Sequence, residues 1–225
     1  MGSSGWVTRI LAKLAALDVL PTEEAAGRDE DEHQRNIREF YAMFLNPKAP
    51  DLEVDEFERR HGIRLPTDYR AFVTEVGNGG YGPGSIGEGL WPFQSSDRLE
   101  WRGDLLGRPF PLAEPPAGLE RWPPVPLTRE TLRHFRSGLL VLSHYGCGIH
   151  ACLVVCGARH GEVWIDDFAN GEMILPARDS WVVTPPKSGG GPSFGEWYEG
   201  WLDQQLERWG RAEPDATADG PNASS

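Results

Sequence analysis

The sequence between Gly138 and Trp209 constrains the fold most strongly. Short runs of β-branched and apolar residues alternate there with turns that contain glycine, which is typical of antiparallel strands joined by tight hairpins. A helix is expected next, because Ser193 and Glu196 form a Ser-x-x-Glu capping box ahead of a wide aromatic face. The expected strands span 139–145, 149–156, 162–166, 172–175 and 181–183, and the helical face consists of Phe194, Trp197, Tyr198, Trp201, Leu202 and Leu206.

Two helices are expected in the N-terminal part of the chain. In the first, apolar residues recur at helical spacing, and the acidic segment 22–32 that follows it favours a solvated linker. In the second, apolar residues follow the i, i+3, i+4, i+7, i+8 pattern of a buried helix face until Asn46-Pro47 ends it. The apolar residues are Trp6, Ile10, Leu14 and Leu17 in the first helix and Ile37, Phe40, Tyr41, Phe44 and Leu45 in the second.

A pair of helices joined by a tight corner is expected after these. Residues 52–61 form one helix with Phe57 inward, and Gly62 supplies the residue that most easily adopts a left-handed conformation at a helix end. Pro66 then opens the other helix. The chain from 78 to 126 is rich in glycine and proline and is either a binding loop or a packed coil, and a short helix follows at 128–135. The apolar stripe of the helix after Pro66 consists of Tyr69, Phe72, Val73 and Val76.

Together these elements predict an α+β fold. We expect a mostly antiparallel sheet of five or six strands, packed with N-terminal helices and a C-terminal helix. The chain divides into an N-terminal amphipathic helix with an acidic linker at 1–33, a main domain at 34–210 and a disordered tail at 211–225.

Composition narrows the classes of partner and compartment. The net charge of −12 and the pI near 4.9 disfavour nucleic acid or an anionic membrane as partner, because phosphate binding relies on clustered Lys and Arg. An acidic surface suits a basic protein partner, or simply keeps the protein in solution. Arg9 and Lys13 interrupt the N-terminal apolar run, so we expect no signal peptide or membrane helix there. Three crowded cysteines fit a reducing compartment, and the cytoplasm is expected.

Several motifs follow one another in a recognisable order. They are a Gly-x-x-Leu-Pro-x-Asp-Tyr-x-x-Phe corner from Gly62 to Phe72, then Asn78-Gly79-Gly80, a strand meander, and a closing Ser-Phe-x-x-Trp-Tyr-x-x-Trp-Leu helix from Ser193. This order, over roughly residues 37–209, resembles the SUKH superfamily, which includes the yeast Smi and Knr cell-wall regulators and many bacterial immunity proteins. The runs 139–148, 153–157 and 161–164 are similar to the actinobacterial branch. The chain departs from the pattern in the segment between 80 and 126 and in the extra N-terminal helix.

The resemblance implies an α+β fold and a role in binding another protein. Bacterial members neutralise the secreted polymorphic toxins encoded beside them by direct contact. The resemblance therefore implies a non-enzymatic immunity protein, or antitoxin, and the acidic charge would complement a cationic toxin domain such as a nuclease. The alternative is a regulatory scaffold in cell-wall or signalling assembly, as the eukaryotic relatives suggest.

His144, Cys147, His150, Cys152 and Cys156 form the most suggestive chemical cluster, since thiolate and imidazole are preferred zinc ligands. They lie across one expected hairpin with alternating side-chain directions, which does not suit the two knuckles of a structural zinc site. Cys152 and Cys156 are expected on one strand face with His150. An enzyme with a Cys147 nucleophile and a histidine base is a further alternative, although the flanking glycines more simply make a hairpin turn. We therefore expect no metal, no cofactor and no catalytic set.

The residues expected to bind a partner lie on loops and hairpin ends, where aromatic and charged groups often carry recognition. Trp91 and Tyr145 are equally compatible with a role as core anchors. The pair Asp166-Asp167 favours a turn over a divalent cation site. The glycine-rich stretches at 77–84 and 189–191 lack the Gly-Lys-Ser/Thr ending of a phosphate-binding loop. The expected set is Asn78, Tyr81, Trp91, Tyr145, His150, Asp166 and Asp167.

Overall fold

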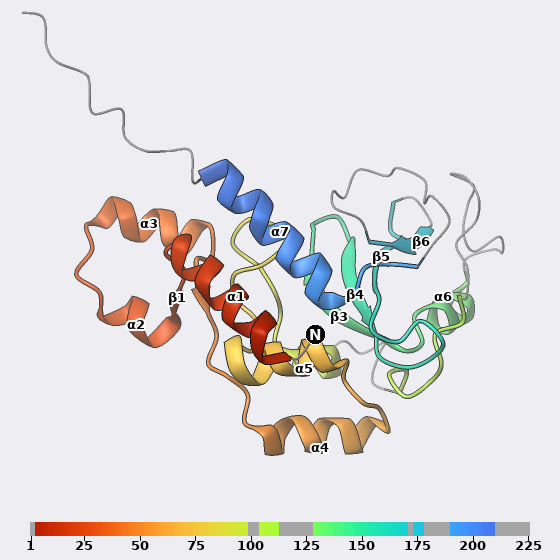
Figure 1. Ribbon diagram of the computed structural model, residues 1–225. Coiled ribbons are helices and arrows are strands. Elements are labelled where there is room, and N and C mark those ends of the chain that lie inside the picture. Colours follow the sequence, from red (N-terminus) through yellow and green to blue (C-terminus); the bar gives the residue numbers. More distant parts are fainter. Residues whose placement is uncertain (1–2, 99–103, 113–127, 171–172, 178–189, 210–225) are drawn as a thin grey trace, which may run out of the picture.

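The computed structural model describes residues 3–98, 104–112, 128–170, 173–177 and 190–209. Within these residues the protein is α+β, and helix α1 (Ser3–Ala16) lies across α7 (Phe194–Trp209) on one side of an antiparallel sheet (Figure 1). This confirms the predicted α+β class. The other helices are α2 (Thr22–Gly27), α3 (Glu32–Phe40), α4 (Asp51–His61), α5 (Thr67–Ala71), a π-helix η1 (Phe72–Val76), a 3-10 helix η2 (Phe93–Arg98) and α6 (Arg129–Phe135).

Four antiparallel strands form a meander in the order β3-β4-β5-β6. Strands that are consecutive in sequence are neighbours in the sheet, as the short glycine-containing turns predict. The strand expected at 181–183 lies outside the described residues. The four strands are β3 (Leu139–His144), β4 (His150–Val154), β5 (Val163–Asp167) and β6 (Met173–Pro176).

The prediction of one sheet with five or six strands is wrong for the described part of the chain. Two further strands, β1 (Leu20–Pro21) and β2 (Phe44–Leu45), form a separate parallel pair. The helix expected to run through Leu45 ends at Phe40, and Ala42 takes a positive φ of 49° as the chain turns into β2. Leu45 is buried as part of a strand. Its assignment to the apolar face of a helix, with a period of 3.6 residues, is therefore wrong.

The glycine-rich segment after η1 joins the two sheets. Gly80 pairs with Leu45 on one side and with Leu90 on the other, and Leu90 pairs in turn with Ser143 of β3. The Leu90 N–H donates to the Gly80 carbonyl over 2.6 Å. Gly80 has a φ of 103°, and a Cβ at this position would overlap the carbonyl oxygen of Phe44, so this close approach requires glycine. Gly80 and Leu90 are therefore packed between the two sheets, whereas the loop between them reaches the surface.

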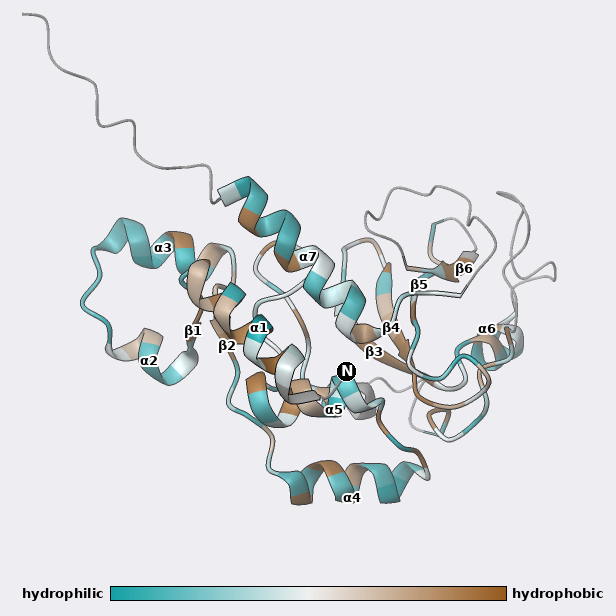
Figure 2. Ribbon diagram, viewed as in Figure 1, coloured by the Kyte–Doolittle hydropathy of each residue, from teal (hydrophilic) through white to brown (hydrophobic). Residues whose placement is uncertain are grey.

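Two hydrophobic clusters lie on opposite faces of the main sheet, because successive side chains of a strand point to opposite sides. Along β4, Leu153 faces the helices, whereas Cys152 faces the second cluster together with Phe110 and Trp164. Figure 2 shows β3 and β4 as a largely hydrophobic centre. We expected Cys156 to share a strand face with Cys152, and this is wrong. Strand β4 ends at Val154, and the Cys156 side chain packs against the first cluster instead.

Helix α1 is part of the first cluster. Its residues Ile10 and Leu14 are almost completely buried. The Glu199 carboxylate of α7 pairs with Arg9 and with Lys13, each at 3.0 Å. The hydrogen bond from Arg9 lowers the pKa of Glu199 below its usual value. Apolar burial and ion pairing therefore hold the first and last described helices together. None of the helices in the described ranges is long and apolar enough to span a bilayer.

The predicted corner between α4 and α5 and the predicted start of α7 are confirmed. Gly62 ends α4 with a φ of 64°, and Pro66 directly precedes α5. Phe57 is buried on the inner face of α4. Ahead of α7, the Glu196 N–H donates to Ser193 Oγ over 3.2 Å, and the Ser193 N–H donates to Glu196 Oε2 over 2.9 Å. The end of α4 at Gly62 and the start of α7 at Ser193 both depend on residues close in sequence, which explains why they could be predicted.

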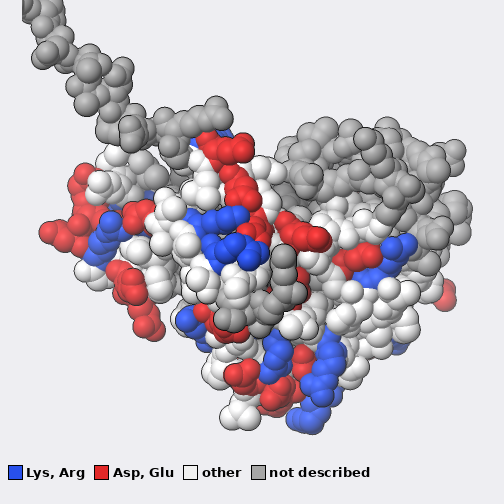
Figure 3. Space-filling model, in the orientation of Figure 1, with Lys and Arg blue, Asp and Glu red and all other residues white. Residues whose placement is uncertain are grey.

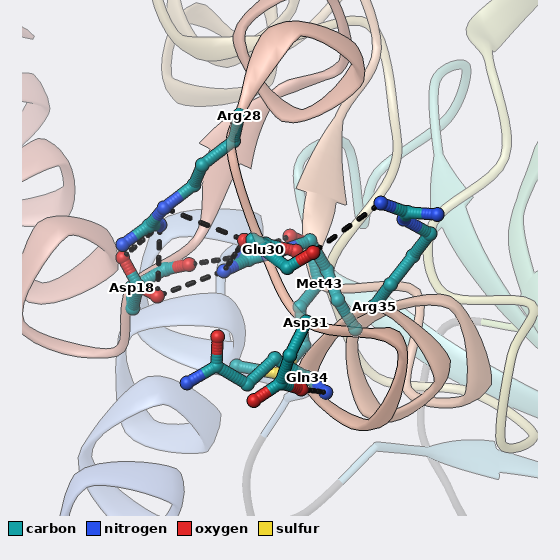
Figure 4. A network of polar contacts seen from close by, with 8 residues as sticks. Asp18, Arg28, Glu30, Asp31, Gln34, Arg35 and Met43 are labelled. Carbon is teal, nitrogen blue, oxygen red and sulfur yellow. Dashed lines mark hydrogen bonds and ion pairs between the residues drawn. The ribbon is translucent and has the colours of Figure 1, made fainter.

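The acidic segment expected as a solvated linker contains α2 and leads into α3, and arginines tie it to the end of α1 (Figure 4). The Arg38 guanidinium lies 2.9 Å from Glu30 and 2.8 Å from Asp18, and Arg28 lies 2.7 Å from Asp18. Burial would raise the pKa of Asp18, but the hydrogen bonds from Arg28 and Arg38 together lower it. Arg38 is thus the buried residue of α3, and the apolar face expected to be buried is exposed at Ile37, Phe40 and Tyr41.

Candidate partner-binding surface

The β3–β4 hairpin ends in a tight turn at one end of the sheet. Gly146, Cys147 and Gly148 have φ values of 89°, 50° and 79°. The Tyr145 N–H donates to the Ile149 carbonyl over 2.8 Å and closes the turn. Cys147 is exposed in its centre. The flanking glycines thus serve the turn geometry, as the sequence predicts.

Two histidines and a tryptophan gather beside this turn. His144 and His150 are cross-strand partners with ring centroids 5.0 Å apart. The Trp91 ring lies 6.2 Å from His144 and 6.1 Å from His150. The backbone N–H of Trp91 donates to the Leu142 carbonyl over 2.7 Å, which fixes the tryptophan along β3. Trp91 also packs against the second cluster, so it anchors the segment while part of its surface stays accessible.

The loop from 82 to 89 lies against the same hairpin end. The Ser85 N–H donates to the His144 carbonyl over 2.7 Å, and a Glu88 carboxylate oxygen lies 3.2 Å from His144 Nδ1. Ile86 is 65% exposed in this loop. Sequence reasoning did not single out Glu88 or Ile86, because only the pairing of Leu90 with β3 brings the loop here. We define the hairpin-end surface as Ile86, Glu88, Trp91, His144, His150, Asp167, Asn170 and the turn at 146–148.

The end of β5 contributes one of its two expected carboxylates to this surface. Asp167 accepts a hydrogen bond from the Asn170 amide over 2.9 Å, and the same amide donates to the Cys147 carbonyl over 2.9 Å. Asp166 is the cross-strand partner of His150 and shares its face of the sheet, opposite to that of Asp167, and its side chain is fully buried. The Arg136 guanidinium binds its two oxygens at 2.7 and 3.1 Å. The structure thus places Asp166 in the core and away from any surface that a partner can touch.

Three other expected residues have clear packing roles. Tyr81 is only 5% exposed, and burial raises its pKa to about 12. The Asn78 side chain accepts a hydrogen bond from the Phe93 N–H over 3.1 Å and so fixes the start of η2. Tyr145 packs against the first cluster, and burial raises the pKa of its phenol. Of the expected set, Trp91 and His150 meet at the hairpin end, and Asp167 is linked to the turn through the Asn170 amide. His150 is the cross-strand partner of the buried Asp166.

The side chains of this surface offer aromatic rings, a free thiol and carboxylates for polar and aromatic contacts. No three His, Cys, Asp or Glu side chains gather as metal ligands in the described part of the chain. All three cysteines are free thiols, and Cys152 is buried in the second cluster. The Trp91 indole and the two imidazoles lie beside the exposed Glu88 carboxylate. Backbone hydrogen bonds to β3 hold Trp91 and the loop in place. Such groups contribute strongly to protein interfaces when they are held in place before binding.

The fold is an α+β domain whose strand meander ends in a tight turn beside a cluster of indole and imidazole rings. The profile of the SMI1/KNR4 family (SUKH-1) matches residues 48–183, which is more than half of the chain, and the chain belongs to this family. The match confirms the resemblance found in the sequence motifs. It includes the hairpin-end surface, whereas α1, α2, α3 and α7 lie outside it. No curated protein and no solved structure gave a significant match.

Proposed function

We propose that this protein is a cytoplasmic, non-enzymatic immunity protein that binds a cationic toxin domain through its hairpin-end surface. Membership of the SUKH-1 family carries the proposal, because the resemblance associates the bacterial members with neutralisation of toxins by direct contact. The hairpin-end surface supports it, since this surface lies within the matched residues and gathers aromatic and acidic side chains.

Charge supports the same class of partner. The chain carries a net charge of −12, and Figure 3 shows carboxylates spread over one face of the molecule. A field of this sign attracts a cationic domain and raises the rate of association, whereas close contacts set the rate of dissociation. Glu88 is 44% exposed beside the histidine pair, so it supplies negative charge at the contact itself.

The test uses the toxin domain encoded beside this gene, produced as an inactive variant, and measures association and dissociation rates with the full chain. We expect Glu88→Lys to lower affinity at least tenfold, mostly through slower association, because it reverses the charge at the surface. Trp91→Ala should raise the dissociation rate. The matched control is Glu56→Lys, which makes the same change of charge at a 59% exposed position on α4.

Two results would contradict the proposal. One is equal weakening by Glu88→Lys and Glu56→Lys, which would leave only a general charge effect. The other is an active toxin that the wild-type chain fails to neutralise in cells. Melting temperatures of all variants are compared in parallel, because a Trp91→Ala protein that melts earlier but binds normally would assign this ring to the core alone.

A further inference from the structure

A second exposed cluster lies where the end of α3 meets the end of α7. Phe40, Tyr41 and Trp209 are 57%, 36% and 44% exposed. The Tyr41 ring links the other two in edge-to-face contacts, with centroid distances of 5.0 Å to Phe40 and 5.6 Å to Trp209. Ile37 is 41% exposed one turn earlier on α3. We call Ile37, Phe40, Tyr41 and Trp209 the aromatic patch.

The aromatic patch faces solvent because α3 is anchored by its polar side. Arg38 is the buried residue of this helix, and it holds Glu30 and Asp18 while its Nη1 also donates to the Met43 carbonyl over 3.3 Å. The helix therefore sits on an ionic network (Figure 4). The apolar stripe that its sequence provides is left exposed. A contiguous apolar patch with a polar rim is typical of an interaction site.

The charge around the aromatic patch selects the kind of partner. Residues 18–39 carry eight carboxylates and three arginines, so the net charge of this segment is 3 − 8 = −5 with histidine neutral. On α7, Asp203 and Glu207 are exposed carboxylates, although Lys13 pairs with Asp203 and the Arg208 guanidinium lies 5.6 Å from the Trp209 ring centre. Carboxylates still outnumber cations around the patch, and Figure 3 shows acidic side chains over α2, α3 and α7. A second copy of this chain or an anionic membrane would bring like charge to the patch. A cationic surface with large apolar side chains matches it in both respects.

We propose that the aromatic patch is a second docking surface and that it binds a cationic amphipathic segment of a partner protein. Apolar anchors of that segment would contact Phe40, Tyr41 and Trp209, and flanking Lys or Arg side chains would face the acidic rim. The four patch residues lie outside the matched range 48–183. The patch thus lies on helices that flank the matched range, and the proposal does not depend on toxin binding through the hairpin-end surface.

The probe is a synthetic, fluorescently labelled helical peptide of about 14 residues, or four turns, with Leu and Trp on one face and Lys on the other. Fluorescence anisotropy measures its binding to the full chain. A second peptide replaces each Lys by Glu, and a third replaces each apolar residue by Ser. We expect the first peptide to bind at least tenfold more tightly than either control and to weaken as salt is added.

Variants of the protein locate the bound peptide. Phe40→Ser and Trp209→Ser should each weaken binding at least tenfold, and because both residues are exposed the folded structure should be retained, as circular dichroism can verify. The matched control is Leu52→Ser, which removes an 81% exposed apolar side chain on α4. Binding that Leu52→Ser weakens as much as Phe40→Ser does would overturn the proposal, as would equal binding of the Glu peptide.

Three further results would show that something else occupies the aromatic patch, and each would overturn the proposal. The first is a dimer in sedimentation that Phe40→Ser dissociates, which would identify a second copy. The second is binding to vesicles with 30% anionic lipid, on the order of a cytoplasmic leaflet, that depends on Phe40. The third is a tenfold gain in peptide affinity when the chain ends at Trp209, which would show that residues 210–225 cover the patch themselves.

Discussion

Removal of the Arg136 guanidinium would measure how much the stability of the second hydrophobic cluster depends on the ion pair with the buried Asp166 carboxylate. Asp166 lies on β5 with a side chain that is 0% exposed, and Arg136 contributes two hydrogen bonds to it from just beyond α6. The same guanidinium lies 5.5 Å from the centre of the Phe168 ring. Arg136→Met keeps most of the aliphatic stem and removes the charge, so it isolates the ionic contribution.

The expected cost follows from the burial of the two partners. Loss of the counter-ion of a buried carboxylate destabilises a protein by about 3–5 kcal/mol, because that ion pair no longer offsets the cost of burying the charge. Arg133→Met provides the matched comparison. Arg133 also pairs with a carboxylate, Asp104 at 2.6 Å, but the side chains are 36% and 52% exposed. Loss of such an exposed pair costs about 1 kcal/mol or less.

Urea denaturation followed by tryptophan fluorescence measures both changes in unfolding free energy. The double variant Arg136→Met with Asp166→Asn should recover at least about 2 kcal/mol of the loss, because it removes the isolated charge. A large contribution from the buried Arg136–Asp166 pair is refuted if Arg136→Met destabilises the protein no more than Arg133→Met does. A double variant that is as unstable as Arg136→Met would likewise place the cost in packing rather than in charge.

Two shorter predictions concern the joint between the sheets and the contact between α1 and α7. Gly80→Ala should destabilise the protein by about 2–4 kcal/mol or prevent folding, because the new Cβ meets the Phe44 carbonyl at a positive φ; a midpoint within 2 °C of the wild type, about the shift from 0.5 kcal/mol, would contradict this. Glu199→Gln should cost about 0.5–1 kcal/mol at pH 7 and less at pH 3. The hydrogen bond from Arg9 lowers the pKa of Glu199 in the folded state, so its contribution is fully present above the unfolded value near 4.5 and is lost as the pH falls through the folded pKa. Thermal unfolding at both pH values checks the second prediction, and a constant difference between the two proteins would refute it.

Elements set by neighbouring residues could be predicted from the sequence. The Gly62 corner, the Ser193 capping box and the turn around Cys147 each depend on residues within a few positions, and each has the predicted form. The same holds for the meander, since its strands are consecutive and its turns are short. Local rules therefore identified the sheet and the turn on which the candidate surface is built.

Elements whose conformation depends on residues far away in the sequence could not be predicted. Phe44 and Leu45 become a strand because Leu20 and Pro21 lie beside them, and no local pattern reports that pairing. Asp166 and Asp167 are identical residue types side by side in the sequence. The register of β5 places only the Asp166 side chain in the core, where Arg136 binds it. The loop with Glu88 reaches the hairpin only through long-range bridges. The composition of the candidate surface therefore depends on tertiary contacts that the sequence pattern does not contain.

The contact between α1 and α7 has a consequence for synthesis of the protein. Lys13 and Glu199 are separated by 186 positions, so α1 leaves the ribosome long before its partner helix exists. At roughly 5–20 residues per second, the apolar side of α1 waits about 10–40 s before α7 can cover it. α5 and η1, which also contact α1, emerge earlier, so the part of α1 that packs on α7 is the last to be covered. We therefore expect the first hydrophobic cluster to close only after α7 has been made.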